Sequence, residues 1–551
     1  MSIRAQGVPS EVERRAFLKG LVAAAAAGAL NPSELLAAAP DPRSRAELES
    51  LLEQAQEGPP LVPLGNGEHP ALVYQAYPGG TGALYRRWAE EGIDPFERHD
   101  IPIEPWTLPV PGNAADIAFL PVDRLAALIQ GRHITSVELT EIYLDRMRRL
   151  DPQLLCAVSI LEGRALEEAQ QADAEIRSGI IRSPLHGIPY GVKDLFTVTG
   201  TRTTWGSDSF SDQQIDEDAD VVIRLREAGA VLMAKLATGE FAAGDRWYRG
   251  QTKNPWNVDE GSSGSSAGPG SATAAGTVGF AIGTETQGSI VSPARRNGLS
   301  ALRPTFGRVS RSGGMVLSWS MDKAGPMCRT IMGCALVFNE IHGASENDPA
   351  SMTGPFRFDP TADVRRYRVG HDEDAPEDFL TQLRVMGLDV EPMPELPQGR
   401  SNALSVESSA AFDFFVSPDG EEPEPVPDDI EDPRERRRRG RFRGGRDTRA
   451  LDYVQGQRRR LALMKDVQET FQGFDMFVSG GGHVGLTNQT GHPAAIVQYG
   501  FGVRNPDADS PTTMPLTTTI LGDLFADDKI LNLAHAFQRR TDWHLRRPAL
   551  D

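Results

Sequence analysis

The sequence predicts an α/β protein with a mixed, mostly parallel, twisted central sheet flanked by helices. Short apolar runs typical of buried strands alternate with segments in which apolar residues recur every three to four positions, as on an amphipathic helix. Apolar residues make up 39% of the 551 residues, which is enough for a large core. Residues 263–303 interleave Gly, Ser, Ala and Thr with apolar residues, and this indicates closely packed backbone rather than a flexible linker.

The individual elements can be placed in order from residue 117 onward. Thr135 to Glu138 reads as a capping box at the start of a helix. A short apolar strand covers residues 188–192 and ends at Lys193. Further helices are expected from Val122 and over 163–177, 220–228, 451–470 and 527–540, further strands over 230–235 and 474–479, and a strand–helix–strand unit over 366–390.

The first 39 residues are typical of a twin-arginine signal peptide. Arg14 and Arg15 precede an alanine-rich apolar run, Leu21–Leu30, and small residues continue to Ala39. This order predicts export to the periplasm. The apolar run is too short to cross a bilayer as a helix, so no stable membrane insertion is expected. An ordinary amphipathic N-terminal helix is the alternative interpretation.

The remaining chain is expected to form one domain over residues 116–546, preceded by an N-terminal extension over 40–115. The extension contains an expected helix, Arg43–Gln56, and a loop rich in proline and glycine, but its function cannot be read. A low-complexity insertion at 419–446 is acidic in its first half and arginine-rich in its second. A nucleic-acid-binding patch is one interpretation. The formal net charge of −19 favours the other, a solvated loop whose two halves neutralise each other.

The composition also bears on metals and cofactors. Cys156, Cys328 and Cys334 are too few for a disulfide framework or a zinc site and are expected to be free, buried thiols. His483 and His492 lie nine residues apart in glycine-rich loops. That spacing fits no compact metal motif, so both are interpreted as loop or support residues. We therefore expect no metal and no cofactor, and the acidic charge argues against nucleic acid as a partner.

Three segments together carry the signal for function. Lys193 ends a strand, Ser265 lies in Gly264-Ser265-Ser266, and Ser289 follows Gly288, 24 residues after Ser265. These segments resemble the amidase signature family, whose characteristic core runs correspond here to 263–270, 283–291 and 298–307. The resemblance extends over about 117–544 and includes residues 187–194, 254–257 and 488–494. It is far more specific than one short motif, and it implies the amidase-signature fold.

The resemblance implies a role for each residue of this trio. Ser289 would be the nucleophile, Ser265 a bridging serine that follows a cis peptide bond, and Lys193 the base. A serine hydroxyl is a weak nucleophile unless a nearby base accepts its proton. A lysine accepts that proton only when it is neutral, and burial behind the apolar run 188–192 would lower its pKa. Ser265 would pass the proton from Ser289 to Lys193 and return it to the departing amine.

The loop around Ser289 is also expected to stabilise the oxyanion. The candidate donors are the backbone N–H groups of Thr286, Gln287, Gly288 and Ser289, because glycine at 288 allows a tight turn. Ser266 and Thr284 are expected to support this loop by hydrogen bonds, and Asp322, which matches a position of the family, is interpreted as structural. Gln287 and Val291 stand where the family commonly has Gly and Arg. They leave the catalytic interpretation intact and are the positions where the specificity of this protein is expected to differ.

The leading hypothesis is an exported, cofactor-independent amidase that hydrolyses a small carboxylic or peptide-type amide through an acyl-enzyme on Ser289. The second hypothesis is the A subunit of an amidotransferase that works on misacylated tRNA. It uses the same core, but the export signal argues against it. A non-catalytic binding protein with the same fold is the third hypothesis, and the intact trio argues against it. Ester or carbamate hydrolysis shares the chemistry, and a homodimer is left open.

Overall fold

The computed structural model describes residues 77–399, 401–418, 425–427, 429–431, 440–504 and 512–550, together with Arg45 and Arg436. The chain divides into two compact units, residues 1–69 and 70–551. All elements named below belong to the second unit. The signal peptide and, apart from Arg45, the expected helix at 43–56 lie outside the described residues. The extension and domain boundaries expected at 40, 116 and 546 stay predictions.

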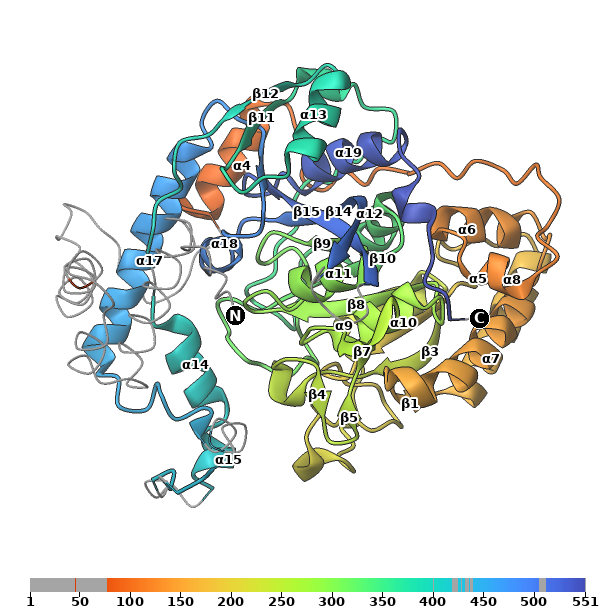
Figure 1. Ribbon diagram of the computed structural model, residues 1–551, viewed down its shortest axis with the longest axis horizontal. Helices are drawn as coiled ribbons and strands as arrows, with labels where there is room; N and C mark the ends of the chain where they lie inside the picture. Colours follow the sequence, from red (N-terminus) through yellow and green to blue (C-terminus); the bar gives the residue numbers. More distant parts are fainter. Residues whose placement is uncertain are drawn as a thin grey trace, which may run out of the picture. The chain divides into compact units, whose positions relative to one another are not determined.

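A mixed sheet forms the centre of the second unit (Figure 1). Within the described residues it has eleven strands in the order β1-β3-β2-β8-β10-β9-β14-β15-β13-β11-β12. The strands are β1 Ala157–Ile160, β2 Pro189–Lys193, β3 Val231–Leu236, β8 Phe280–Glu285, β9 Ser300–Arg303, β10 Lys323–Cys328, β11 Arg368–His371, β12 Asp389–Pro392, β13 Met476–Ser479, β14 Ala494–Arg504 and β15 Thr512–Gly522.

The expected mixed α/β architecture is confirmed, but six of the ten neighbouring strand pairs in the described sheet are antiparallel, so parallel pairing does not predominate as expected. Parallel pairs join β3 to β2 to β8 and β13 to β11 to β12, where helices cross between strands. The other neighbouring strands pair antiparallel, including the long β14–β15 hairpin. Parallel pairing is thus concentrated in two blocks rather than spread through the sheet.

Helices surround this sheet. Those confirmed near their expected bounds are α6 Val122–Gln130, α7 Ser136–Leu154, α8 Glu162–Arg177, α9 Asp220–Glu227, α13 Glu377–Val385, α17 Ala450–Thr470 and α19 Asp527–Gln538. The Thr135–Glu138 capping box is present at the start of α7. The others are α4 Gly80–Glu90, α5 Ala114–Ala118, α10 Ala267–Ala274, α11 Val291–Asn297, α12 Ile331–Ile341, α14 Ala403–Ala411, α15 Asp413–Val416 and α18 Val484–Thr490.

Short elements complete the fold. Two small sheets pair β4 Arg246–Trp247 with β5 Gly250–Gln251 and β6 Lys253–Asn254 with β7 Asn257–Gly261. Single 3₁₀ turns occur at Asp208–Phe210, Glu240–Ala242, Val364–Arg366 and Trp543–Leu545. No helix in the described ranges is long and apolar enough to cross a membrane.

The small residues of the 263–303 segment pack as the sequence suggests. All residues of α10 are buried, and this helix contacts the adjacent strands β3, β2, β8 and β10. Small side chains let the helix backbone approach the strands closely. The three cysteines are free and buried, as expected.

The insertion at 419–446 differs from the expected solvated loop. Phe442 is buried in an aromatic cluster with Phe241 and Phe412. Arg441 donates a hydrogen bond to the Glu240 carbonyl and lies over the ring of Phe241. The described part of the arginine-rich half therefore packs on the main body, because Phe442 is buried among aromatic side chains there. Most of the acidic half lies outside the described residues.

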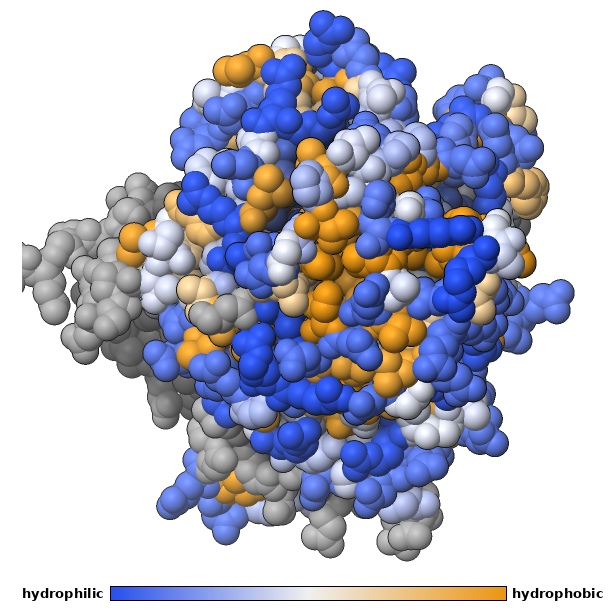
Figure 2. Space-filling view, turned by 90° about the vertical axis from the view of Figure 1, so that its right-hand side faces the viewer, coloured by the Kyte–Doolittle hydropathy of each residue, from blue (hydrophilic) through white to orange (hydrophobic). Residues whose placement is uncertain are grey.

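The surface carries one further feature. Figure 2 shows apolar side chains gathered in the middle of the face that forms the right-hand side of Figure 1, with polar side chains around them. Contiguous apolar surface of this kind is typical of contact faces between proteins. The homodimer that the sequence leaves open stays a prediction.

Candidate active site

Lys193 meets the serine segment at the end of β2. Its Nζ atom lies 2.8 Å from Ser265 Oγ and 2.8 Å from Thr284 Oγ1. Thr284 belongs to β8, the parallel neighbour of β2, so the sheet itself brings the lysine and the threonine together. Ser265 lies in the loop that leads into α10. The lysine and the bridging serine, 72 residues apart in sequence, are thus in direct contact.

The surroundings of Lys193 favour its neutral form. The side chain is fully buried. Burial lowers the pKa of the ammonium well below its usual value, and the more distant carboxylates of Asp322 and Glu285 only partly oppose this. Its close contacts are two hydroxyl groups rather than a carboxylate. A neutral amine in this position can accept a proton from Ser265.

Close backbone packing shapes the segment around Ser265. The peptide bond between Gly264 and Ser265 is cis, as the resemblance implies. A Cβ atom at position 264 would lie 1.9 Å from the carbonyl oxygen of Gly244, so only glycine fits there. The N–H group of the next residue, Ser266, donates a hydrogen bond to the Ser289 carbonyl at 3.2 Å.

Ser266 also ties this segment to β8. Its hydroxyl donates to the Thr284 carbonyl at 3.0 Å and accepts from the Thr284 N–H at 3.1 Å. The expected supporting contacts of Ser266 and Thr284 are therefore present, and they fix the spacing between the two serine segments.

The loop from Thr286 to Ser289 presents unengaged donors. Gly288 has φ of +97°, in the left-handed region that favours glycine. No hydrogen bond between described residues engages the N–H groups of Thr286, Gln287, Gly288 or Ser289. Ser289 is partly buried and Gln287 is exposed. The assignment of these four N–H groups as oxyanion donors stays a prediction.

Glu285 holds the other side of this loop, and the sequence reasoning missed it. Its carboxylate accepts hydrogen bonds from the N–H groups of Ile290 and Val291 at 2.7 and 2.8 Å. It forms an ion pair with Arg303 at 3.1 Å and accepts from the Asn488 side chain at 2.6 Å. Although burial opposes ionisation, Arg303 and these donors lower the pKa of Glu285. The sequence feature that could have identified Glu285 is its place, as an acidic residue, at the end of a largely apolar strand.

Asp322 anchors the start of the loop. Thr286 Oγ1 donates to Asp322 Oδ1 at 2.6 Å, and the N–H groups of Leu317 and Ser318 donate to Asp322 Oδ2 at 2.8 and 2.9 Å. The expected structural role of Asp322 is confirmed, and the Thr286 side chain is part of the support.

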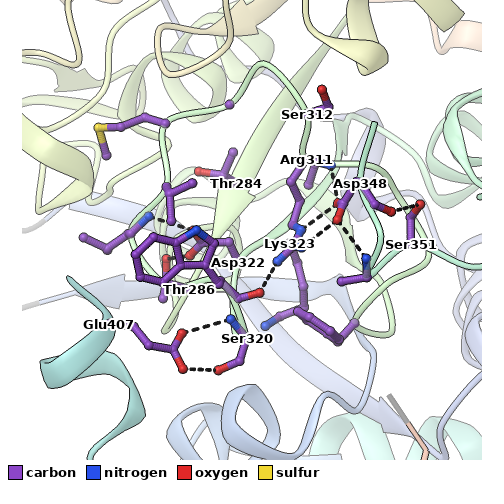
Figure 3. Close-up of a pocket in the computed structure, with 18 of the residues that line it drawn as sticks. Thr284, Thr286, Arg311, Ser312, Ser320, Asp322, Lys323, Asp348, Ser351 and Glu407 are labelled. Carbon is purple, nitrogen blue, oxygen red and sulfur yellow. Dashed lines mark hydrogen bonds and ion pairs between the residues drawn. The ribbon is translucent and has the colours of Figure 1, made fainter. Parts of the chain in front are cut away.

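A cavity of about 680 Å³ adjoins these residues. Thr284 and Thr286 line it, and the 311–324 segment, the 347–352 loop and α14 and α17 supply much of the rest of the lining. Figure 3 shows Arg311 and Asp348 pointing toward each other and Glu407 pointing toward Ser320. The cavity is large enough for a drug-sized molecule.

The two histidines lie outside this chemistry. His492 is buried, bonded to Thr490 at 2.8 Å and stacked on Phe471, and burial lowers its pKa to about 3. His483 lies 3.3 Å from the Asp372 carboxylate. The support role expected for His492 is confirmed. No cluster of three or more potential metal ligands occurs among the residues that the structure describes.

Comparison with known proteins places this site in a family. The amidase family profile matches residues 138–479. The A subunit of glutamyl-tRNA(Gln) amidotransferase from Marinomonas sp. (strain MWYL1) is 31% identical over 479 residues, 78% of this chain and 98% of that protein. The chain therefore belongs to the amidase signature family, and it is an enzyme of the type that acts on amide C–N bonds.

Solved structures agree with this assignment. The native peptide amidase from Stenotrophomonas maltophilia is 29% identical, with a TM-score of 0.63 and coverage of 78% of this chain and 98% of that chain. A peptide amidase bound to the competitive inhibitor chymostatin is 28% identical, with a TM-score of 0.65 and coverage of 78% and 99%. The amidase-signature fold expected from the sequence is confirmed.

Proposed function

We propose that the protein hydrolyses a carboxylic or peptide-type amide through an acyl-enzyme on Ser289. The observation that carries this proposal is the fully buried Lys193 at 2.8 Å from Ser265. A buried amine beside a hydroxyl is a base in contact with a proton relay, and the Ser265–Ser266 segment is bonded to the backbone of Ser289.

The proposed first step acylates Ser289. Its oxygen bonds to the amide carbon while its proton passes to Ser265, which gives its own proton to Lys193. The carbonyl electrons move to the oxygen, and the free N–H groups of 286–289 bind the resulting anion. When this intermediate collapses, the C–N bond breaks. The departing amine takes a proton from Ser265, which is reprotonated by Lys193.

The second step reverses these roles with water. Water gives a proton through Ser265 to Lys193 and attacks the acyl carbon. Collapse breaks the bond to Ser289 Oγ, which recovers its proton from the relay, and the acid leaves. Thr284, bonded to Lys193, keeps the amine directed at Ser265 throughout.

Hydrolysis of a panel of aliphatic, aromatic and C-terminal peptide amides tests this proposal. Ser289→Ala should lower kcat at least about 10³-fold, and Lys193→Ala about 10²- to 10⁴-fold. Ser292→Ala is the matched control, because Ser292 is an exposed serine three residues further along. Activity unchanged in Lys193→Ala would overturn the mechanism.

A second candidate is ammonia transfer onto misacylated tRNA. The 31% identity to the amidotransferase protein from Marinomonas over 98% of its length favours it. An amide-hydrolysis assay on the isolated chain, with no other protein or tRNA present, distinguishes the two candidate functions. Turnover of simple amides by the chain alone supports the hydrolase. Ammonia release only after partner proteins have been supplied supports the transferase. A binding protein would bind amides and turn over none.

We also propose export by the twin-arginine route, on the strength of the Arg14–Arg15 pair and the apolar run after it. Joint replacement of Arg14 and Arg15 by lysine should retain the protein in the cytoplasm, as measured by cell fractionation. The same replacement at Arg43 and Arg45 is the control. Equal periplasmic amounts of both variants would contradict the proposal.

A further inference from the structure

We propose that the cavity beside Thr284 and Thr286 binds an aromatic part of the substrate against Trp319 and discriminates against a free carboxylate. This inference rests on the proposed amide hydrolysis and names the substrate class of the same site. It follows from two features of the cavity lining, an exposed aromatic ring on a hydrogen-bonded backbone and cationic side chains that already have partners.

Trp319 is the open aromatic ring of the lining. Its exposed fraction is 49%, whereas Phe196 and Phe306 of the same lining are 1% and 2% exposed. The fourth aromatic residue of the lining, Tyr453, is only partly exposed, and its hydroxyl donates to Glu407 at 3.1 Å. Proteins usually bury tryptophan for the most part. A half-exposed indole on a cavity wall offers a flat apolar surface that an aromatic ligand can cover.

The backbone under this ring is held on every side. Arg311 donates to the Trp319 carbonyl at 2.5 Å. The preceding residue, Ser318, donates through its hydroxyl to Glu407 at 2.6 Å, and the following residue, Ser320, donates its N–H to the same carboxylate at 2.9 Å. The backbone position of Trp319 is thus set before a ligand arrives, which lowers the ordering cost of binding.

The same residues connect the ring to the reaction centre. Asp322, three positions after Trp319, accepts a hydrogen bond from Thr286 of the loop that carries Ser289. Thr286 and Trp319 both line the cavity. A substrate ring on Trp319 therefore lies in the same cavity that reaches the nucleophile loop.

The charges of the lining oppose an anionic ligand. Its two cationic residues already have partners: Arg311 is bound by both oxygens of Asp348 at 2.8 Å, and the Lys323 amine bonds to the Met321 carbonyl. Burial also lowers the pKa of Lys323 well below its usual value. Asp348 is offset by Arg311, and two further carboxylates, Asp322 and Glu407, line the same space. A ligand carboxylate in this cavity is therefore repelled by the lining carboxylates. Among the described lining residues, no cationic side chain is without a partner to bind it.

Steady-state kinetics on four primary amides of graded character test the inference. The set is propionamide, 3-cyclohexylpropionamide, 3-phenylpropionamide and its 4-carboxy derivative. Trp319→Ala should lower kcat/KM for 3-phenylpropionamide roughly threefold to tenfold, mainly through KM, and leave propionamide within about twofold. Trp319→Phe should restore most of the loss. Phe414→Ala is the matched control, because Phe414 is 56% exposed and lies outside the cavity lining.

The wild type should turn over the 4-carboxy derivative at least about tenfold less efficiently than 3-phenylpropionamide. Equal losses on propionamide and 3-phenylpropionamide in Trp319→Ala, or equal efficiency with the carboxylate, would overturn the inference. If the wild type hydrolyses none of the four amides and no C-terminal peptide amide, the proposed function fails instead. The inference is then decided by calorimetry on Ser289→Ala and on the double variant that also carries Trp319→Ala. The affinities of both proteins for 3-phenylpropionamide and its 4-carboxy derivative should differ by the same factors as given above for kcat/KM.

Discussion

Replacing Lys193 by methionine tests whether this lysine is uncharged in the folded protein. The side chain is fully buried, and burial lowers its pKa well below the usual value. In the unfolded chain a lysine titrates near pH 10.4. Between these two pKa values the unfolded state binds one more proton than the folded state, so the free energy of unfolding rises with pH.

The size of this effect follows from one proton. A single group contributes about 1.4 kcal/mol per pH unit in that window. If Lys193 is neutral in the folded protein at pH 7, the wild type should gain about 2.7 kcal/mol relative to Lys193→Met between pH 7 and pH 9. Lost hydrogen bonds to Ser265 and Thr284 shift both values equally and cancel in this comparison.

Urea unfolding at pH 7, 8 and 9 measures this difference directly. Lys529→Met is the control. Although burial opposes it, the hydrogen bond to Asp475 raises the pKa of Lys529, so this lysine is protonated in both states over the range. The control should show no pH dependence relative to wild type. A flat difference for Lys193→Met as well would mean that Lys193 is charged in the folded protein, and it would refute its role as the base.

Three further predictions concern the same site. The value of kcat/KM should rise with pH through the lowered pKa of Lys193 and then level off, and initial rates that fall over that range would count against the relay. Glu285→Gln should lower the free energy of unfolding by about 3 kcal/mol, because Arg303 is left buried without an ionised partner; an unchanged urea midpoint would contradict this. Thr286→Val should lower kcat about tenfold through the lost bond to Asp322, with little change in melting temperature, while Thr286→Ser should retain activity.

Much of the fold was readable because local patterns and the final structure agree. The capping box at Thr135 starts α7 where the sequence places it, and the apolar run before Lys193 forms β2 within one residue of its expected bounds. The strand–helix–strand unit over 366–390 appears as β11, α13 and β12. These elements depend on periodicity and caps, which a single sequence carries.

Elements whose conformation depends on packing against distant residues could not be predicted from the sequence. The β14–β15 hairpin and helix α4 lie in segments without a clear period, and tertiary packing decides their conformation. Phe442 looked like part of a charged loop, but it packs in a cluster with Phe241 and Phe412. No local rule links residues so far apart.

The site divides in the same way. Lys193, Ser265 and Ser289 stand in recognisable segments, so their sequence context points to them. The contact between Glu285 and Asn488 joins residues 203 positions apart, and only the fold brings them together. Trp319 and Glu407 likewise become neighbours of the site through the 311–324 segment and α14.

Covalent labelling tests the central claim most directly. A serine-directed phosphonylating probe, followed by peptide mapping with mass spectrometry, reports which serine is the activated nucleophile. We expect labelling at Ser289 that is absent in Ser289→Ala, greatly slowed in Lys193→Ala and unchanged in Ser292→Ala. Labelling at another residue, or an unlabelled Ser289 in a preparation that hydrolyses amides, would contradict the assignment of Ser289 as the nucleophile.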